Sequence, residues 1–338
     1  MRILVTGGAG YVGSVSVEAL VDAGHEAVVV DNLATGHRWA DLAGSRLVEG
    51  TYTDRAFMAE TLRSHDIDAV LHCGARSLVG ESIRDPALYF RENVAGGIAL
   101  LEAMRDANVQ RLVISSTAAV YGVPDASPIS EDAVLRPINP YGESKRSLEA
   151  AAGWFASAYG LRVASLRYFN VAGATARNGE THDPETHLIP NALNAVAGGP
   201  PLTLYGTDYP TPDGTPIRDY VHVADLAEAH RLALEATEPG DARTDAMLIC
   251  NLGSGVGFSV FQVLAAAEKV LGREIPHVVG ERRAGDPPTL VASIERARDV
   301  LGWGPTGSTL EEMIGSAWTY RQTLGRGRPD TGQLETTG

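Results

Sequence analysis

The chain has 338 residues, of which 44% are hydrophobic and 21% charged, as in a water-soluble protein of two packed lobes. Its formal net charge of −14 disfavours nucleic acid and anionic membrane surfaces as partners, because both are negatively charged. No stretch reaches the roughly 18 apolar residues that span a bilayer, and no leader-like segment follows Met1. We therefore expect a cytoplasmic protein.

Short strands and helices alternate over the first half of the chain. Strands are predicted at residues 3–6, 26–31, 46–49, 69–72, 111–115 and 163–167, and helices at 12–23, 54–64, 86–107 and 141–159. Gly24 and Gly160 follow two of the helices, where glycine ends a helix well. This alternation predicts an α/β fold with a doubly wound, parallel Rossmann-type sheet.

The pattern changes after residue 172, where Gly- and Pro-rich loops at 198–201 and 210–214 separate shorter elements. We expect residues 1–172 to form the NAD-binding domain, with later segments returning to it. Residues 173–325 are predicted to form mainly a smaller, partly interleaved C-terminal α/β lobe for the substrate, and residues 326–338 a disordered tail. Cys73 and Cys250 lie in apolar runs, which favours buried thiols over a disulfide, and no metal site is expected.

A glycine-rich turn follows the first predicted strand, with Gly7, Gly10 and Gly13 at its key positions. Gly7 permits the turn, Gly10 lets the backbone approach a pyrophosphate, and Gly13 lets helix and strand pack closely. The helix N-terminus then offers free N–H groups to the phosphates. Asp31 ends the second strand, where a carboxylate accepts hydrogen bonds from an adenosine ribose and repels a 2′-phosphate. The sequence thus favours NAD over NADP.

Tyr141 and Lys145 begin the helix at 141–159, and their spacing puts both side chains on one face. A nearby ammonium and a bound cationic nicotinamide together lower the pKa of a phenol, so that Tyr141 acts as a general base. Thr117 follows the strand at 111–115, at the edge of the sheet where ligands bind. Each feature also fits a structural role, as a surface tyrosine beside a lysine or as a helix cap.

Together, the glycine turn, the Ser/Thr segment and Tyr-x-x-x-Lys resemble the extended short-chain dehydrogenase/reductase family. Further segments narrow the resemblance, over about residues 1–322, to the UDP-glucose 4-epimerase family. These segments lie at residues 139–142, 166–170, 214–222, 251–255 and 282–286.

The resemblance implies interconversion of UDP-galactose and UDP-glucose through a 4-keto intermediate, with transient reduction of tightly bound NAD, as in galactose metabolism. It assigns catalysis to Tyr141, Lys145 and Thr117. It places at the cofactor Gly7, Gly10, Tyr11, Val12, Gly13, Asp31, Asn32, Thr51, Cys73, Ser77, Asn93, Tyr141, Lys145 and Tyr168. It places at the UDP-sugar Thr117, Asn170, His187, Leu188, Tyr205, Arg218, Tyr220, Arg283, Asp286 and Leu290. The helices at 86–107 and 141–159 correspond to those of the family's dimer interface, so a homodimer is expected.

Several positions depart from the family pattern. Thr51 stands where an aspartate usually holds the adenine amino group. Ser77 stands where some members have a lysine near the pyrophosphate, with Arg76 as the alternative cation. We therefore expect the contacts to adenine to be weaker or rearranged. Ala118 and Ala119 replace the acid–base pair of the related sugar dehydratases, so dehydration is not expected. Leu290 is intermediate in size at the position near C2 of the sugar.

Three alternatives remain open. Leu290 leaves UDP-N-acetylhexosamines as possible substrates, and the same catalytic residues would serve an epimerase of UDP-pentoses. A non-catalytic, NAD-responsive regulator is the third, and the proton-transfer set of Thr117, Tyr141 and Lys145 argues against it.

Overall fold

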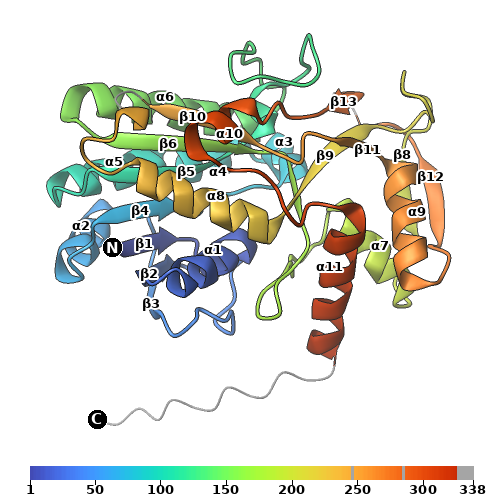
Figure 1. Ribbon diagram of the computed structural model, residues 1–338, viewed down its shortest axis with the longest axis horizontal. Coiled ribbons are helices and arrows are strands. Elements are labelled where there is room, and N and C mark those ends of the chain that lie inside the picture. Colours follow the sequence, from blue (N-terminus) through green and yellow to red (C-terminus); the bar gives the residue numbers. More distant parts are fainter. Residues whose placement is uncertain (245–246, 284–285, 326–338) are drawn as a thin grey trace.

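The central feature of the fold is a seven-stranded parallel sheet with strand order β10-β6-β5-β4-β1-β2-β3 (Figure 1). The computed structural model describes residues 1–244, 247–283 and 286–325, so the predicted tail at 326–338 lies outside the described residues. The strands of this sheet are β1 (Arg2–Thr6), β2 (Glu26–Asp31), β3 (Arg46–Glu49), β4 (Ala69–His72), β5 (Arg111–Thr117), β6 (Arg162–Tyr168) and β10 (Leu248–Leu252). The predicted doubly wound Rossmann-type sheet is confirmed.

Both faces of the sheet are covered, which explains its continuous apolar strands. In β1, Ile3 and Val5 enter one core whereas Leu4 enters the other. The first core is closed by α1, α8 and α10, and the second by α2, α5 and α6. The bounds are α1 (Tyr11–Asp22), α2 (Arg55–Ser64), α5 (Gly97–Asp106), α6 (Pro140–Tyr159), α8 (Val223–Ala236) and α10 (Glu295–Leu301).

The helix predicted at 86–107 is interrupted by a π-helical turn. It consists of α4 (Pro86–Tyr89), the π-helix η1 (Phe90–Gly96) and α5. The wider turn buries Asn93, whose amide donates to the Arg76 carbonyl at 2.9 Å and accepts from the Arg76 N–H at 2.8 Å. Such turns are frequent at functional sites. This one fixes the backbone that follows β4.

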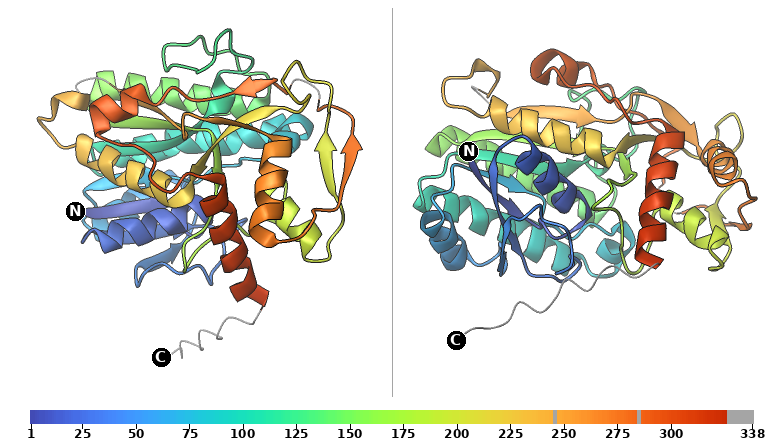
Figure 2. Two further views of the ribbon diagram at one scale, coloured as in Figure 1. Left: turned by 45° about the vertical axis from the view of Figure 1, so that its right-hand side comes forward. Right: turned by 60° about the horizontal axis from the view of Figure 1, so that its bottom comes forward.

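A second group of elements lies to one side of the sheet (Figure 2). One small sheet pairs β8 (Leu202–Tyr205) with β12 (His277–Gly280). The other contains β7 (Asn170–Ala172), β9 (Ile217–His222), β11 (Gly257–Ser259) and β13 (Thr289–Leu290). Its helices are α7 (Leu188–Val196), α9 (Val260–Leu271) and α11 (Leu310–Gly325), which share a separate hydrophobic core. The remaining short elements are α3 (Val79–Arg84), η2 (Ala118–Val120) and η3 (Ala242–Thr244). No helix in the described ranges is long and apolar enough to cross a membrane.

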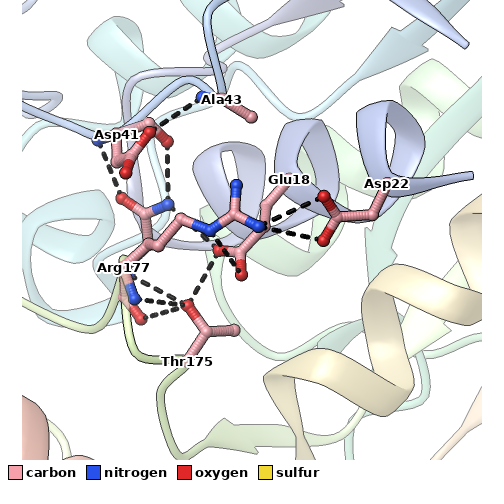
Figure 3. A network of polar contacts seen from close by, with 7 residues as sticks. Glu18, Asp22, Asp41, Ala43, Thr175 and Arg177 are labelled. Atoms are coloured by element: carbon pink, nitrogen blue, oxygen red, sulfur yellow. Dashed lines mark hydrogen bonds and ion pairs between the residues drawn. The ribbon is translucent and has the colours of Figure 1, made fainter. Parts of the chain in front are cut away.

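The loop between β7 and α7, residues 173–187, is fastened back onto α1 (Figure 3). Arg177 pairs with Asp22 at 3.1 Å and with Glu18 at 3.5 Å. Asn178 donates its amide to the Asp41 carbonyl at 2.8 Å and accepts from the Asp41 N–H at 3.0 Å. The loop therefore joins the second group of elements to the part of the chain that forms the seven-stranded sheet.

Candidate active site

A cavity of about 500 Å³ opens at the carboxyl ends of the parallel strands. Ligands bind at this edge of doubly wound sheets because the loops diverge there. Seventeen of the predicted site residues line the cavity: Gly7, Gly10, Tyr11, Val12, Gly13, Asp31, Cys73, Ser77, Thr117, Tyr141, Lys145, Tyr168, Asn170, His187, Arg283, Asp286 and Leu290. The fold thus brings most members of both predicted sets, cofactor and substrate, to one cavity.

Seven predicted residues stand outside the lining: Asn32, Thr51, Asn93, Leu188, Tyr205, Arg218 and Tyr220. Three of them contact lining residues directly, and one of these is Tyr220, which is paired with Asn170 between β7 and β9. Arg218 pairs with Asp286 at 2.5 Å, and the Arg283 guanidinium lies 4.1 Å from the centre of the Tyr205 ring. Asn93 acts on the cavity through the backbone of Arg76, as described above.

The glycine turn has the geometry that its sequence predicts. Gly7 has a φ of +66°, and a Cβ at Gly13 would lie 2.1 Å from the Gly7 carbonyl oxygen, so neither position tolerates a side chain. A Cβ at Gly10 would meet only that same oxygen, at 3.4 Å, and would otherwise point into open space. The carboxylate of Asp31 accepts from the Ala9 N–H at 3.0 Å and from the Leu33 N–H at 2.8 Å.

These features fit a dinucleotide. Gly10 caps α1 without a side-chain hydrogen bond, which leaves the helix N-terminus free for a pyrophosphate. The open space over Gly10 is where that group would approach the backbone. Asp31 lines the same cavity, in position for a ribose.

Helix α6 brings Tyr141 against the end of β5. Asn139 caps the helix by accepting from the Gly142 N–H at 2.8 Å. A Cβ at Gly142 would lie 2.5 Å from the Ala119 carbonyl oxygen, so glycine allows the helix to approach the segment after Thr117. Tyr141 and Thr117 therefore line the cavity side by side. The Lys145 ammonium, on a side chain almost completely buried, donates to the Ser115 carbonyl at 2.8 Å.

Without the cofactor, the electrostatics of the site do not lower the pKa of the Tyr141 phenol. Burial raises the pKa of Tyr141, and the Thr117 hydroxyl only partly opposes this. Burial also lowers the pKa of Lys145 to about 8, although Cys73 and Glu149 oppose that shift. Lys145 therefore keeps its charge at neutral pH, but the predicted lowering of the Tyr141 pKa does not arise from the chain alone. A cationic nicotinamide beside the phenol would act in the required direction.

A buried ion pair beneath the site was missed by the sequence analysis. Arg167 on β6 binds Glu149 on α6 through two nitrogens, at 2.8 and 3.1 Å, and both side chains are almost fully buried. The same carboxylate accepts from the hydroxyls of Ser116 and Ser165, at 2.5 and 2.9 Å. Glu149 lies one helical turn after Lys145, so the pair fixes the helix that carries the candidate base. An arginine within a largely apolar strand was the available signal.

Two segments that depart from the family pattern, around Thr51 and around Cys73, contact each other. The Thr51 hydroxyl is 2.9 Å from that of Thr53 and does not reach the cavity lining. The neighbouring Tyr52 ring lies against Gly74, where a Cβ would be 2.9 Å from a ring carbon. Gly74, which follows Cys73, therefore leaves room for the ring of Tyr52.

Comparison with known proteins agrees with this geometry. Residues 3–251 match the model of the NAD dependent epimerase/dehydratase family. The UDP-glucose 4-epimerase of Streptococcus mutans is 49% identical over 335 residues, which are 98% of this chain and 99% of that protein. The chain belongs to the NAD dependent epimerase/dehydratase family, and its relatives at this level of identity are UDP-glucose 4-epimerases.

Two solved structures extend the comparison. The UDP-glucose 4-epimerase of Brucella ovis, in complex with NAD, is 44% identical with a TM-score of 0.90, covering 94% of this chain and 97% of that one. The enzyme of Stenotrophomonas maltophila, with bound NAD and formylated UDP-arabinopyranose, is 39% identical with a TM-score of 0.91, covering 96% and 99%.

Proposed function

We propose that this chain is an NAD-dependent UDP-glucose 4-epimerase that interconverts UDP-galactose and UDP-glucose. The observation that carries the proposal is that Thr117, Tyr141 and Lys145 line the same cavity as the glycine turn. A proton-transfer set beside a dinucleotide cradle suits oxidation of a hydroxyl and its reversal. The identity to UDP-glucose 4-epimerases over nearly the whole chain supports the same activity.

In the proposed reaction, Tyr141 accepts the proton of the sugar 4-hydroxyl and later returns it to the same oxygen. The chemistry that bound NAD supplies is reversible acceptance of the C4 hydride. The Thr117 hydroxyl partly opposes the rise in the pKa of the phenol, and the Lys145 charge favours the phenolate during the transfer. The 4-keto sugar then presents its other face to the returning hydride.

The diphosphate and the base of the substrate are assigned to the second lobe. Arg283 lines the cavity, and Arg218 reaches it through its ion pair with Asp286. A guanidinium matches the geometry of phosphate oxygens. We propose that the Tyr205 ring, now covered by Arg283, stacks on the uracil, with Asn170 and Leu290 nearer the sugar. In this proposal residues 1–172, with β10, α8 and α10, hold NAD, and most of residues 173–325 hold the UDP-sugar.

The test is to incubate the purified protein separately with UDP-galactose, UDP-N-acetylgalactosamine and UDP-arabinose and to identify the products. Formation of UDP-glucose as the fastest conversion supports the proposal. A faster conversion of UDP-arabinose would favour the pentose alternative, for which the ligand of the Stenotrophomonas structure gives a specific reason. No conversion of any of the three would contradict an epimerase.

Leu290 is expected to set tolerance for an N-acetyl group, because it lines the cavity and is only half-buried. We expect Leu290→Tyr to lower kcat/KM for UDP-N-acetylgalactosamine at least tenfold and to change that for UDP-galactose much less. Steric exclusion by the larger ring is the reason. Steady-state assays on both substrates check this, and a proportional loss on both would refute the selectivity.

The grip on adenine is expected to be weak because Thr51 turns to Thr53 rather than to the cavity. We expect the purified protein to lose part of its NAD on gel filtration, and Thr51→Asp to retain several times more. A carboxylate there would accept a hydrogen bond from the adenine amino group. An enzymatic NAD assay on the eluted, denatured protein measures both. Full stoichiometric NAD in the unmodified protein would contradict the expectation.

We also propose a cytoplasmic homodimer. Trp154 on α6 is 75% exposed and Phe90 on η1, which packs against α6, is 41% exposed, so a helical interface between two copies would cover apolar surface there. Both cysteines are free thiols, consistent with a reducing compartment.

We expect Trp154→Glu to yield a monomer at micromolar concentration, because the charge would be buried without a partner in a helical interface. Light scattering after gel filtration gives the mass. The matched control is Phe261→Glu on α9, another exposed aromatic, which should leave the dimer intact. A monomeric unmodified protein, or a dimeric Trp154→Glu variant, would refute the interface.

A further inference from the structure

The loop at residues 173–187 carries a cluster that the proposed reaction does not explain. Glu180, His182, Glu185 and His187 each offer one ligand atom, and these four atoms all lie within 4.8 Å of one another. Of the four, only His187 was predicted at the site, as a substrate residue, and the sequence analysis expected no metal. The alternating spacing, Glu-x-His-x-x-Glu-x-His, brings two imidazoles and two carboxylates together within eight residues.

The four groups converge on one point. The Nδ1 atom of His187 lies 2.6 Å from the Oε1 atom of Glu180 and 2.8 Å from that of Glu185. The Nδ1 atom of His182 lies 2.9 Å from the same Glu180 oxygen. One ring nitrogen carries at most one proton, so the two carboxylates share a single donor at His187. Ligands of a tetrahedral zinc ion lie roughly 3.3 Å apart, since each bond is about 2.0–2.2 Å long.

The supports of the cluster are already in place. Glu185 Oε1 also accepts from the backbone N–H groups of Thr186 and His187, at 2.7 and 2.8 Å. The Thr181 carbonyl accepts from the His37 ring at 3.3 Å, and the contacts of Arg177 and Asn178 hold the start of the loop on α1 and Asp41 (Figure 3). Fixed ligands lower the ordering cost of binding an ion.

The burial of the four side chains also suits an ion. The Glu180 and Glu185 side chains are only 7% and 11% exposed, whereas those of His182 and His187 are 27% and 46% exposed. Nearly buried carboxylates need positive charge nearby. Glu180, His182 and His187 also line the cavity, which gives an ion a route of entry.

We propose that Glu180, His182, Glu185 and His187 bind a divalent transition-metal cation of the zinc class at the substrate end of the cavity. Two imidazoles select such a cation over Mg²⁺ or Ca²⁺, which prefer oxygen ligands alone. An ion held there would fix the 180–187 segment and engage His187, which faces the UDP-sugar pocket.

The test is calorimetric titration of Zn²⁺ alone into the NAD-loaded protein after dialysis against EDTA. We expect one equivalent to bind with a Kd in the micromolar range or below. His182→Asn and Glu185→Gln should each weaken binding at least tenfold, and His182→Asn/Glu185→Gln should abolish it. The matched control is His277→Asn, at an exposed histidine on β12, which should bind as the unmodified protein does.

Absence of stoichiometric binding to the unmodified protein would overturn the proposal. So would unchanged affinity in both single variants, because the ion would then bind elsewhere. Two single variants are used so that a failure of one to fold still leaves a test. The titration needs no UDP-sugar, so its result is independent of whether the chain proves to be the proposed epimerase.

Discussion

Replacement of Tyr141 by phenylalanine is expected to lower kcat for UDP-galactose epimerisation by roughly 10²–10⁴-fold, the usual contribution of a general acid–base group. The variant loses only the phenolic oxygen, so the ring keeps its edge contact with Tyr89, 6.3 Å away. The glycine turn and Asp31 are untouched, so the NAD content should equal that of the unmodified protein. Steady-state kinetics and NAD content, measured on the same preparation, check both parts.

The matched control is Tyr159→Phe, at the exposed end of the same helix, which should retain full activity. If Tyr141→Phe were as active as the unmodified protein, the assigned base would be wrong. Full activity together with an NAD-dependent binding function would favour a regulator instead. Loss of NAD along with activity would show that the phenol acts mainly in holding the cofactor.

Glu149→Gln is expected to be the most destabilising single change that we consider. Arg167 would keep its charge in a nearly dry interior without its partner, which costs about 3–5 kcal/mol of unfolding free energy in comparable buried pairs. Tyr121 would still accept from Arg167 at 2.9 Å but cannot neutralise it. Urea denaturation, monitored by circular dichroism, gives the difference in the free energy of unfolding between the variant and the unmodified protein.

Two further variants serve as controls for the loss of stability expected for Glu149→Gln. Glu143→Gln removes a partly exposed pair with Arg146 on the same helix and should cost no more than about 1 kcal/mol. Glu149→Leu/Arg167→Met removes both charges and should recover much of the loss, because the penalty comes from the unpaired charge. A Glu149→Gln variant as stable as Glu143→Gln would show that the buried pair contributes little.

The sequence predicted the parts of the fold that depend on local pattern. Alternating apolar strands and helices predicted the parallel sheet, and Gly7 and Gly13 predicted a turn too tight for side chains. The π-helical turn around Asn93 could not be predicted in this way. Its register depends on hydrogen bonds to Arg76, which is 17 residues away.

The candidate site follows the same division between local and long-range information. Tyr141 and Lys145 are recognisable because helical spacing alone puts them together. Glu149 and Arg167 meet only when α6 packs on β6, so neither reveals its partner in the sequence. The four side chains of Glu180, His182, Glu185 and His187 likewise converge because of a loop conformation. Sequence periodicity predicts helices and strands but not the conformation of such a loop.

The position of β10 at the outer edge of the sheet has a consequence for synthesis. The outer edge of β6 has no pairing strand until β10 has been synthesised. β10 ends at Leu252, roughly 80 residues after Tyr168, the last residue of β6. At about 5–20 residues per second, the ribosome leaves that edge open for several seconds or longer. An unpaired apolar edge invites pairing with another nascent chain. A slow codon stretch between these strands would therefore be expected to reduce the soluble yield.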